Sequence, residues 1–73
     1  EAIDIDMDGT AITNKQVFDY IKDNLNFDQL IWEFGSASNP DWVHVSYNAS
    51  GKQRKEVLKA SKSGSKTVYS PYK

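Results

Sequence analysis

Residues 4–10 read DIDMDGT and place three aspartates at alternate positions, just before a glycine. Carboxylates at such spacing can bind a divalent cation, and an aspartate can also attack phosphorus as a nucleophile. The three aspartates and the glycine match positions one, three, five and six of an EF-hand calcium loop. Position twelve should supply a bidentate glutamate, but Lys15 stands there. A cation at that position argues against a calcium loop. The segment before Asp4 is also too short to form the entering helix of an EF-hand.

The same stretch, from Asp6 to Thr10, also resembles the Asp-x-Asp-Gly-Thr box of haloacid-dehalogenase-like phosphatases. In that family one aspartate attacks phosphorus, the second handles the proton, and magnesium neutralises the phosphoryl oxygens. In those phosphatases the Asp-x-Asp-Gly-Thr box follows a fully buried parallel strand. In this chain the acidic Asp4 interrupts the apolar residues of the preceding strand. A doubly wound domain also needs more βα units than 73 residues supply. A phosphatase that uses Asp6 and Asp8 therefore remains an alternative only.

The first seven residues alternate between two kinds of side chain. Ile3, Ile5 and Met7 fall on one side, and Asp4 and Asp6 fall on the other. This two-residue period predicts a half-buried strand with an acidic face. Acids that share one strand face repel one another unless a cation or a basic group lies opposite, so the pattern favours a functional face.

A helix is predicted from Thr13 or Asn14, either of which can cap its N-terminus, to about Asn24. Apolar residues follow the cap at helical spacing and would form one buried stripe, namely Val17, Phe18, Ile21 and Leu25. This is the clearest helical pattern in the chain.

Two further segments, residues 29–34 and 42–47, are rich in β-forming residues, and we expect them to pair as strands. In the second segment, Trp42, His44 and Ser46 alternate onto one face. The sequence thus predicts one face of a sheet that carries a histidine and a tryptophan.

The tail, residues 53–72, is predicted to form a hairpin that turns at residues 63–65, with a short helix over 53–60 as the alternative. Together these elements predict one α+β domain over residues 1–73. Its expected architecture is a small antiparallel sheet packed on one main helix.

Composition narrows the classes of function and the sources of stability. Nine basic and ten acidic residues give a net charge of -1, which favours neither nucleic acid nor an anionic membrane as a partner. No apolar run approaches the roughly 18 residues that a membrane span needs. With no cysteine, so small a domain would rely on a metal, a partner or additional chain rather than on disulfides. We expect the basic run 52–55 to be solvated. We expect the largest aromatic residues to form the core, namely Phe18, Phe27, Trp32, Phe34 and Trp42.

Three short motifs occur in a distinctive order, namely Glu1-Ala2-Ile3-Asp4, residues 27–35 (FDQLIWEFG) and Asp41-Trp42-Val43-His44. Together they resemble the zinc D-alanyl-D-alanine carboxypeptidase family of the hedgehog/DD-peptidase superfamily, above all its phage and prophage-type members. Zinc in that family is held by a His-x-x-Gly-x-Ala-x-Asp motif and by a second histidine near the end of the domain. The resemblance implies that Asp4 and His44 are zinc ligands and that the fold is hedgehog/DD-peptidase-like.

The chain departs from the family pattern at two points. It starts one residue after the expected glycine, so the first histidine of the motif would lie before Glu1. Residues 1–73 are therefore expected to be the C-terminal portion of a zinc peptidase domain, without its upstream His-x-x-Gly segment. Family members carry a general-base glutamate three residues before the second histidine, where this chain has Asp41. Glu33 on the neighbouring strand is the other candidate base, provided that its side chain faces the same way.

The resemblance implies a zinc-dependent peptidase that acts on peptidoglycan stem peptides during phage lysis or cell-wall remodelling in bacteria. It would be a D-Ala-D-Ala carboxypeptidase or an endolysin-type endopeptidase. Catalytic zinc usually has three protein ligands, and with two of them we expect this chain alone to bind zinc weakly and to have little activity. The competing class is a non-catalytic or vestigial module that binds cell wall.

Overall fold

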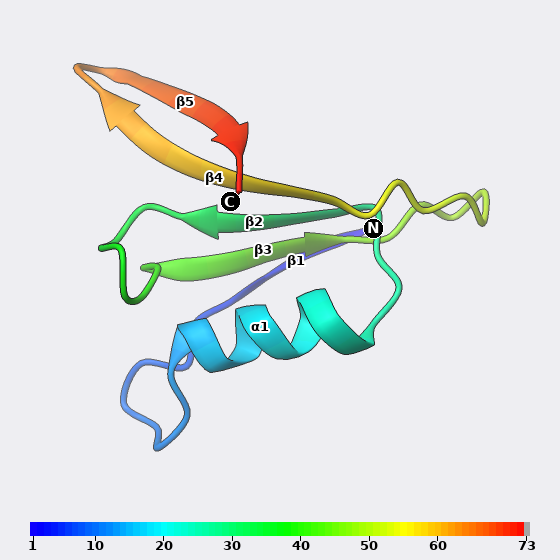
Figure 1. Cartoon of the computed structure of the whole chain (residues 1–73), viewed down its shortest axis with the longest axis horizontal. Coiled ribbons are helices and arrows are strands. Elements are labelled where there is room, and N and C mark those ends of the chain that lie inside the picture. Colours follow the sequence, from blue (N-terminus) through cyan, green and yellow to red (C-terminus); the bar gives the residue numbers. More distant parts are fainter. Residues whose placement is uncertain (73) are drawn as a thin grey trace.

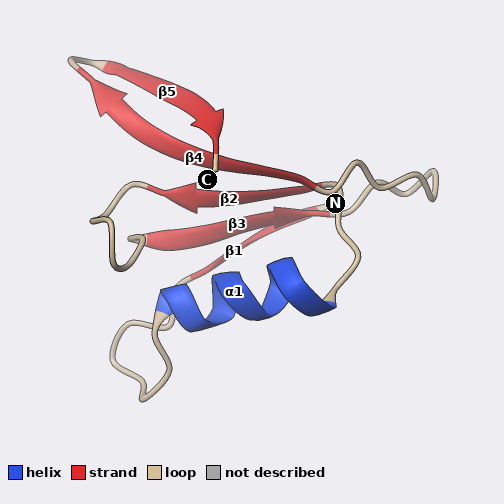
Figure 2. Cartoon of the chain, viewed as in Figure 1, coloured by secondary structure: helices blue, strands red, loops and turns tan. Residues whose placement is uncertain are grey.

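The computed structural model describes residues 1–72 as an α+β fold with one helix and a mixed sheet of five strands (Figures 1 and 2). Across the sheet the strand order is β1-β3-β2-β4-β5. The elements in chain order are β1 (Ala2–Ile5), α1 (Asn14–Asn24), β2 (Gln29–Glu33), β3 (Trp42–Ser46), β4 (Glu56–Ser63) and β5 (Lys66–Pro71). Within residues 1–72, no helix is long and apolar enough to cross a membrane.

Helix α1 begins and ends where the sequence predicts. The Thr13 side chain accepts a hydrogen bond from the Gln16 backbone, and the Gln16 side chain accepts one from the Thr13 backbone. This reciprocal capping box satisfies two amides that the first turn leaves without helical partners. At the other end, Leu25 closes the helix with an extended backbone. The helix packs against the sheet through a core of Phe18, Ile21, Phe27, Leu30, Trp32 and Val43.

The sheet is mixed, so the prediction of a small antiparallel sheet was wrong in one pairing. β3 lies antiparallel to both β1 and β2, but β4 pairs with β2 in parallel. The cause is the path of the chain: after β3 it returns through residues 47–55 to the far side of β2, so β4 runs opposite to β3. Two backbone hydrogen bonds fix this return, from Lys55 to Phe27 and from Glu56 to Asp28.

An ion pair anchors the same crossover. Both oxygens of the Asp28 carboxylate accept hydrogen bonds from the Arg54 guanidinium, at 2.9 and 2.8 Å. These hydrogen bonds, with one from the Arg54 backbone, lower the pKa of Asp28 to about 2. Arg54 belongs to the basic run that the sequence predicted to be solvated. Its side chain is indeed largely exposed, but it also holds the strand crossover.

The predicted tail hairpin is confirmed, and the alternative helix over residues 53–60 was wrong. β4 and β5 pair in antiparallel from Leu58 with Pro71 to Ser63 with Lys66, around a turn that places Gly64 at a φ of 63°. The hairpin extends past the end of β2 (Figure 1).

The expected aromatic core is confirmed for three of its five members. Phe18, Phe27 and Trp32 are buried on the helix side of the sheet. Phe34 and Trp42 are only half-buried and contact each other, with ring centroids 5.5 Å apart. Trp42 lies on the face that the helix leaves open, because Val43, its neighbour in β3, points into the helix-side core.

Candidate functional site

The face of the sheet opposite α1 carries most of the residues that the sequence singled out. Asp4 lies directly across from His44, and His44 lies directly across from Ile31 in β2. Glu33, two residues after Ile31, lies across from Trp42. Because residues directly opposite each other in a sheet share a face, the open face combines two carboxylates, an imidazole and an indole from three strands.

Asp4 and His44 form the closest contact in this group. Asp4 Oδ1 and His44 Nδ1 are 2.8 Å apart, although 40 residues separate them in the chain. The side chains are 64% and 27% exposed, respectively, so a ligand from solvent can reach both. Strand pairing thus brings together the two residues that the sequence predicts as metal ligands.

Glu33 faces the same side, which meets the condition placed on it as a candidate base. The residue is only 7% exposed, and this burial raises the pKa of its carboxyl. The charge of His44 lowers the same pKa, and the charge of Asp4 raises it, which places the carboxyl within the field of that pair. A carboxyl whose pKa is moved toward neutrality is better suited to transfer protons at neutral pH.

Asp41, the other candidate base, lies elsewhere. It directly precedes β3, and side-chain alternation directs it away from the face that carries Trp42 and His44. Its backbone is engaged at both ends, since its amide donates to Glu33 O at 2.9 Å and its carbonyl accepts from the Asn14 side chain at 2.9 Å. Glu33 is therefore better placed than Asp41 to act beside the Asp4–His44 pair.

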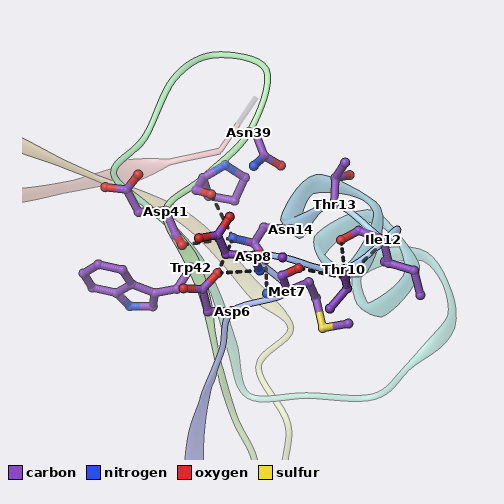
Figure 3. Close-up of a pocket in the computed structure, with 12 residues that line it drawn as sticks. Asp6, Met7, Asp8, Thr10, Ile12, Thr13, Asn14, Asn39, Asp41 and Trp42 are labelled. Carbon is purple, nitrogen blue, oxygen red and sulfur yellow. Dashed lines mark hydrogen bonds between the residues drawn. The ribbon is translucent and has the colours of Figure 1, made fainter.

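Asn14 joins the two chain segments that carry this pair. Its Oδ1 accepts from the Met7 amide at 2.6 Å, just after β1. Its Nδ2 donates to Asp6 Oδ1 and to the carbonyls of Pro40 and Asp41, just before β3, at 2.9–3.1 Å (Figure 3). The residue is 5% exposed. One buried amide thus ties the end of the strand that bears Asp4 to the start of the strand that bears His44.

We expect Asn14→Ala to lower the free energy of unfolding by about 1–3 kcal/mol, because it leaves the buried Pro40 carbonyl, the partly buried Met7 amide and the partly buried Asp41 carbonyl without their side-chain partner. Urea unfolding followed by tryptophan fluorescence measures this change. Asn24→Ala is the matched control, since Asn24 is exposed at the helix end, and it should change stability by no more than about 0.5 kcal/mol. Equal stability of the two variants would contradict a clamping role for Asn14.

Asp6 and Asp8 lie in a different environment from Asp4. The Asp6 carboxylate accepts from the Asp8 amide at 3.0 Å and from Asn14, so it closes the turn after β1. Both aspartates line a hollow of about 530 Å³ between this turn and the loop before β3 (Figure 3). They also follow an edge strand that pairs antiparallel, which is not the buried parallel strand that the phosphatase interpretation expects.

Two other residues on the face of His44 have partners in the sheet. The hydroxyl of Ser46 accepts a hydrogen bond from the backbone amide of Gln29. Trp42 packs edge-on against Phe34 and also borders the hollow beside Asp41. Neither Asn14 nor this hollow was predicted from the sequence. Asn14 was considered only as a helix cap, and the contacts that bury it are with residues 26 and 27 positions away.

Comparisons with protein-family models, with curated proteins and with solved structures found no match to this chain. Within residues 1–72, no group of three or more His, Cys, Asp and Glu side chains is arranged to hold a metal ion. Assignment of a function therefore rests on the geometry of the open face and on the sequence motifs.

Proposed function

We propose that this domain is part of a zinc-dependent peptidase that acts on peptidoglycan stem peptides, with Asp4 and His44 as two of the zinc ligands. The observation that supports the proposal most is the 2.8 Å contact of His44 Nδ1 with Asp4 Oδ1 on an open, solvent-accessible face. Imidazole nitrogen and carboxylate oxygen are both typical zinc ligands.

The spacing of the two atoms also suits zinc. With zinc–nitrogen and zinc–oxygen bonds of about 2.0–2.1 Å, two ligand atoms of a tetrahedral site lie about 3.3 Å apart. Asp4 and His44 would need to separate only slightly from their present contact. A bound zinc ion would supply Lewis-acid polarisation of the scissile carbonyl and a nucleophile at neutral pH.

Glu33 would handle the proton in this proposal. Its carboxyl is buried on the same face and its pKa is raised, so it can take a proton from the attacking water and deliver it to the leaving amine. The half-buried Trp42, directly across from Glu33, would shield one side of the reacting groups from solvent.

The proposal is tested with a pair of extended chains. One carries a His-x-x-Gly segment directly before Glu1, which completes the motif His-x-x-Gly-x-Ala-x-Asp, and the other carries Ala-x-x-Gly. With micromolar zinc, the histidine version should release D-alanine from a stem pentapeptide ending in D-Ala-D-Ala, or cut within that peptide. The alanine version should show little or no activity. Absence of cleavage by the histidine version would refute the peptidase assignment, and binding of the peptide without cleavage would favour a cell-wall-binding module.

In the histidine version, Glu33→Gln should lower turnover by about 100-fold or more, because general acid–base catalysis contributes roughly 10²–10⁴-fold. Zinc affinity should change much less, since Glu33 is not proposed as a ligand. Turnover of the stem peptide and zinc calorimetry are measured on the same samples. Glu56→Gln on β4 is the matched control and should keep its activity; a comparable loss there would remove the special role of Glu33.

A further inference from the structure

A line of aromatic contacts leads from the proposed site to a lysine at the end of the sheet. Trp42 is two residues from His44 on the same face, and its ring lies 5.5 Å from the ring of Phe34. The ammonium nitrogen of Lys62 on β4 lies 5.4 Å from the centre of the Phe34 ring, a cation–π contact. Lys62 shares the open face because Ala60, two residues before it, pairs with Glu33.

This end of the sheet contains a groove. β2 ends at Glu33, whereas β4 continues to Ser63, so the last residues of β4 pair with β5 alone in the described chain. The resulting hollow has a volume of about 340 Å³. Its lining combines the β2–β3 loop with β4 and includes Phe34, Lys59, Ala60 and Lys62.

The charged side chains that line the groove are all basic. Lys59 and Lys62 both line it, and among residues 1–72 no acidic side chain does. None of the ion pairs within residues 1–72 includes Lys59 or Lys62. The proposed site at the other end of the aromatic line carries Asp4 and Glu33. Of the two lysines, only Lys62 lies on the open face, because Lys59 pairs with Trp32 of the helix-side core. The open face is thus acidic where the chemistry is proposed and carries the positive charge of Lys62 at the groove.

We propose that the groove binds a free carboxylate of the peptide substrate, with Lys62 as the residue that recognises it. This inference rests on the proposed function and specifies its substrate: a stem peptide with a carboxylate, rather than a carboxamide, a few residues before the scissile bond. Trp42 and Phe34 lie between His44 and Lys62 through the two ring contacts, so the scissile bond and the carboxylate would occupy opposite ends of this aromatic line.

Two synthetic pentapeptides test the inference. Both end in D-Ala-D-Ala and have γ-linked D-glutamate as their second residue; one carries its α-carboxylate free, and the other carries it as the carboxamide. Their affinities for residues 1–73 are measured by NMR titration at low ionic strength without zinc, so that the result does not depend on catalysis. We expect the free carboxylate to bind about three to five times more tightly, the range of an exposed charge pair, and the difference to shrink in salt.

The decisive comparison is between two lysine variants. Lys62→Ala should abolish the preference for the carboxylate, whereas Lys52→Ala, which changes an exposed lysine outside the groove, should keep it. Equal binding of the two peptides by the unmodified chain, a preference that survives Lys62→Ala, or no binding of either peptide at millimolar concentration would each overturn the inference. None of these results would bear on the zinc titration, so failure of the groove and failure of the proposed metal site are distinguishable.

Discussion

Zinc binding by residues 1–73 is expected to be weak and to fall below detection in both Asp4→Ala and His44→Ala. Each substitution removes one of two proposed ligands that lie 2.8 Å apart. The loss should exceed the roughly 10–100-fold that removal of an outer-shell partner costs in metal sites. Calorimetric titration at neutral pH, in a buffer without phosphate, measures it.

The size of the loss of zinc affinity in Asp4→Ala distinguishes two possible roles of Asp4. A loss beyond about 100-fold indicates a direct ligand, whereas a smaller loss with His44→Ala still fully disruptive indicates that Asp4 only orients the imidazole. Asp8→Ala is the matched control, because Asp8 is an exposed aspartate on the same segment. If all three variants lost zinc equally, binding would reflect the general acidity of the segment rather than the proposed pair.

The elements predicted best are those that local sequence determines. Thr13 and Gln16 are three residues apart and stabilise the helix start by themselves, so the helix could be located without knowledge of its surroundings. The tail hairpin turns at Gly64, which adopts a positive φ that favours glycine. Strict alternation in β1 and β3 likewise predicted which side chains share a face within each strand, whereas only the resemblance to the zinc peptidases implied that Asp4 and His44 belong to one site.

What the sequence did not predict depends on contacts between distant segments. The parallel pairing of β2 with β4 follows from the return of the chain after β3, and neither strand carries a local signal of direction. The burial of Asn14 and the choice between Glu33 and Asp41 arise from the same cause. A strand pattern gives the alternation of faces, but only the assembled sheet shows which face the helix covers. Phe34 and Trp42 were assigned to the core for that reason, although they flank the open face.

Loss of one buried ring is expected to remove a large share of the free energy of unfolding. Phe18 is fully buried, and its ring lies 5.2 Å from the ring of Trp32, edge-on, and 4.9 Å from that of Tyr72. Truncation of a buried phenylalanine to alanine typically costs about 3–5 kcal/mol. A domain of this length has a free energy of unfolding of only roughly 4–11 kcal/mol at 0.05–0.15 kcal/mol per residue. Phe18→Ala should therefore remove between about a quarter of the stability and all of it.

Tyr20→Ala provides the matched control, because Tyr20 lies on the same helix two residues away and is 61% exposed. Its substitution should leave stability within about 0.5 kcal/mol of the unmodified chain. Both variants are compared by urea unfolding without zinc, followed by the fluorescence of Trp32 and Trp42. If Phe18→Ala unfolded at the same urea concentration as Tyr20→Ala, the packing of α1 on the sheet would not be what stabilises this domain. The strands that carry the open face would then have to be held in place by something other than the helix, which packs on their opposite side.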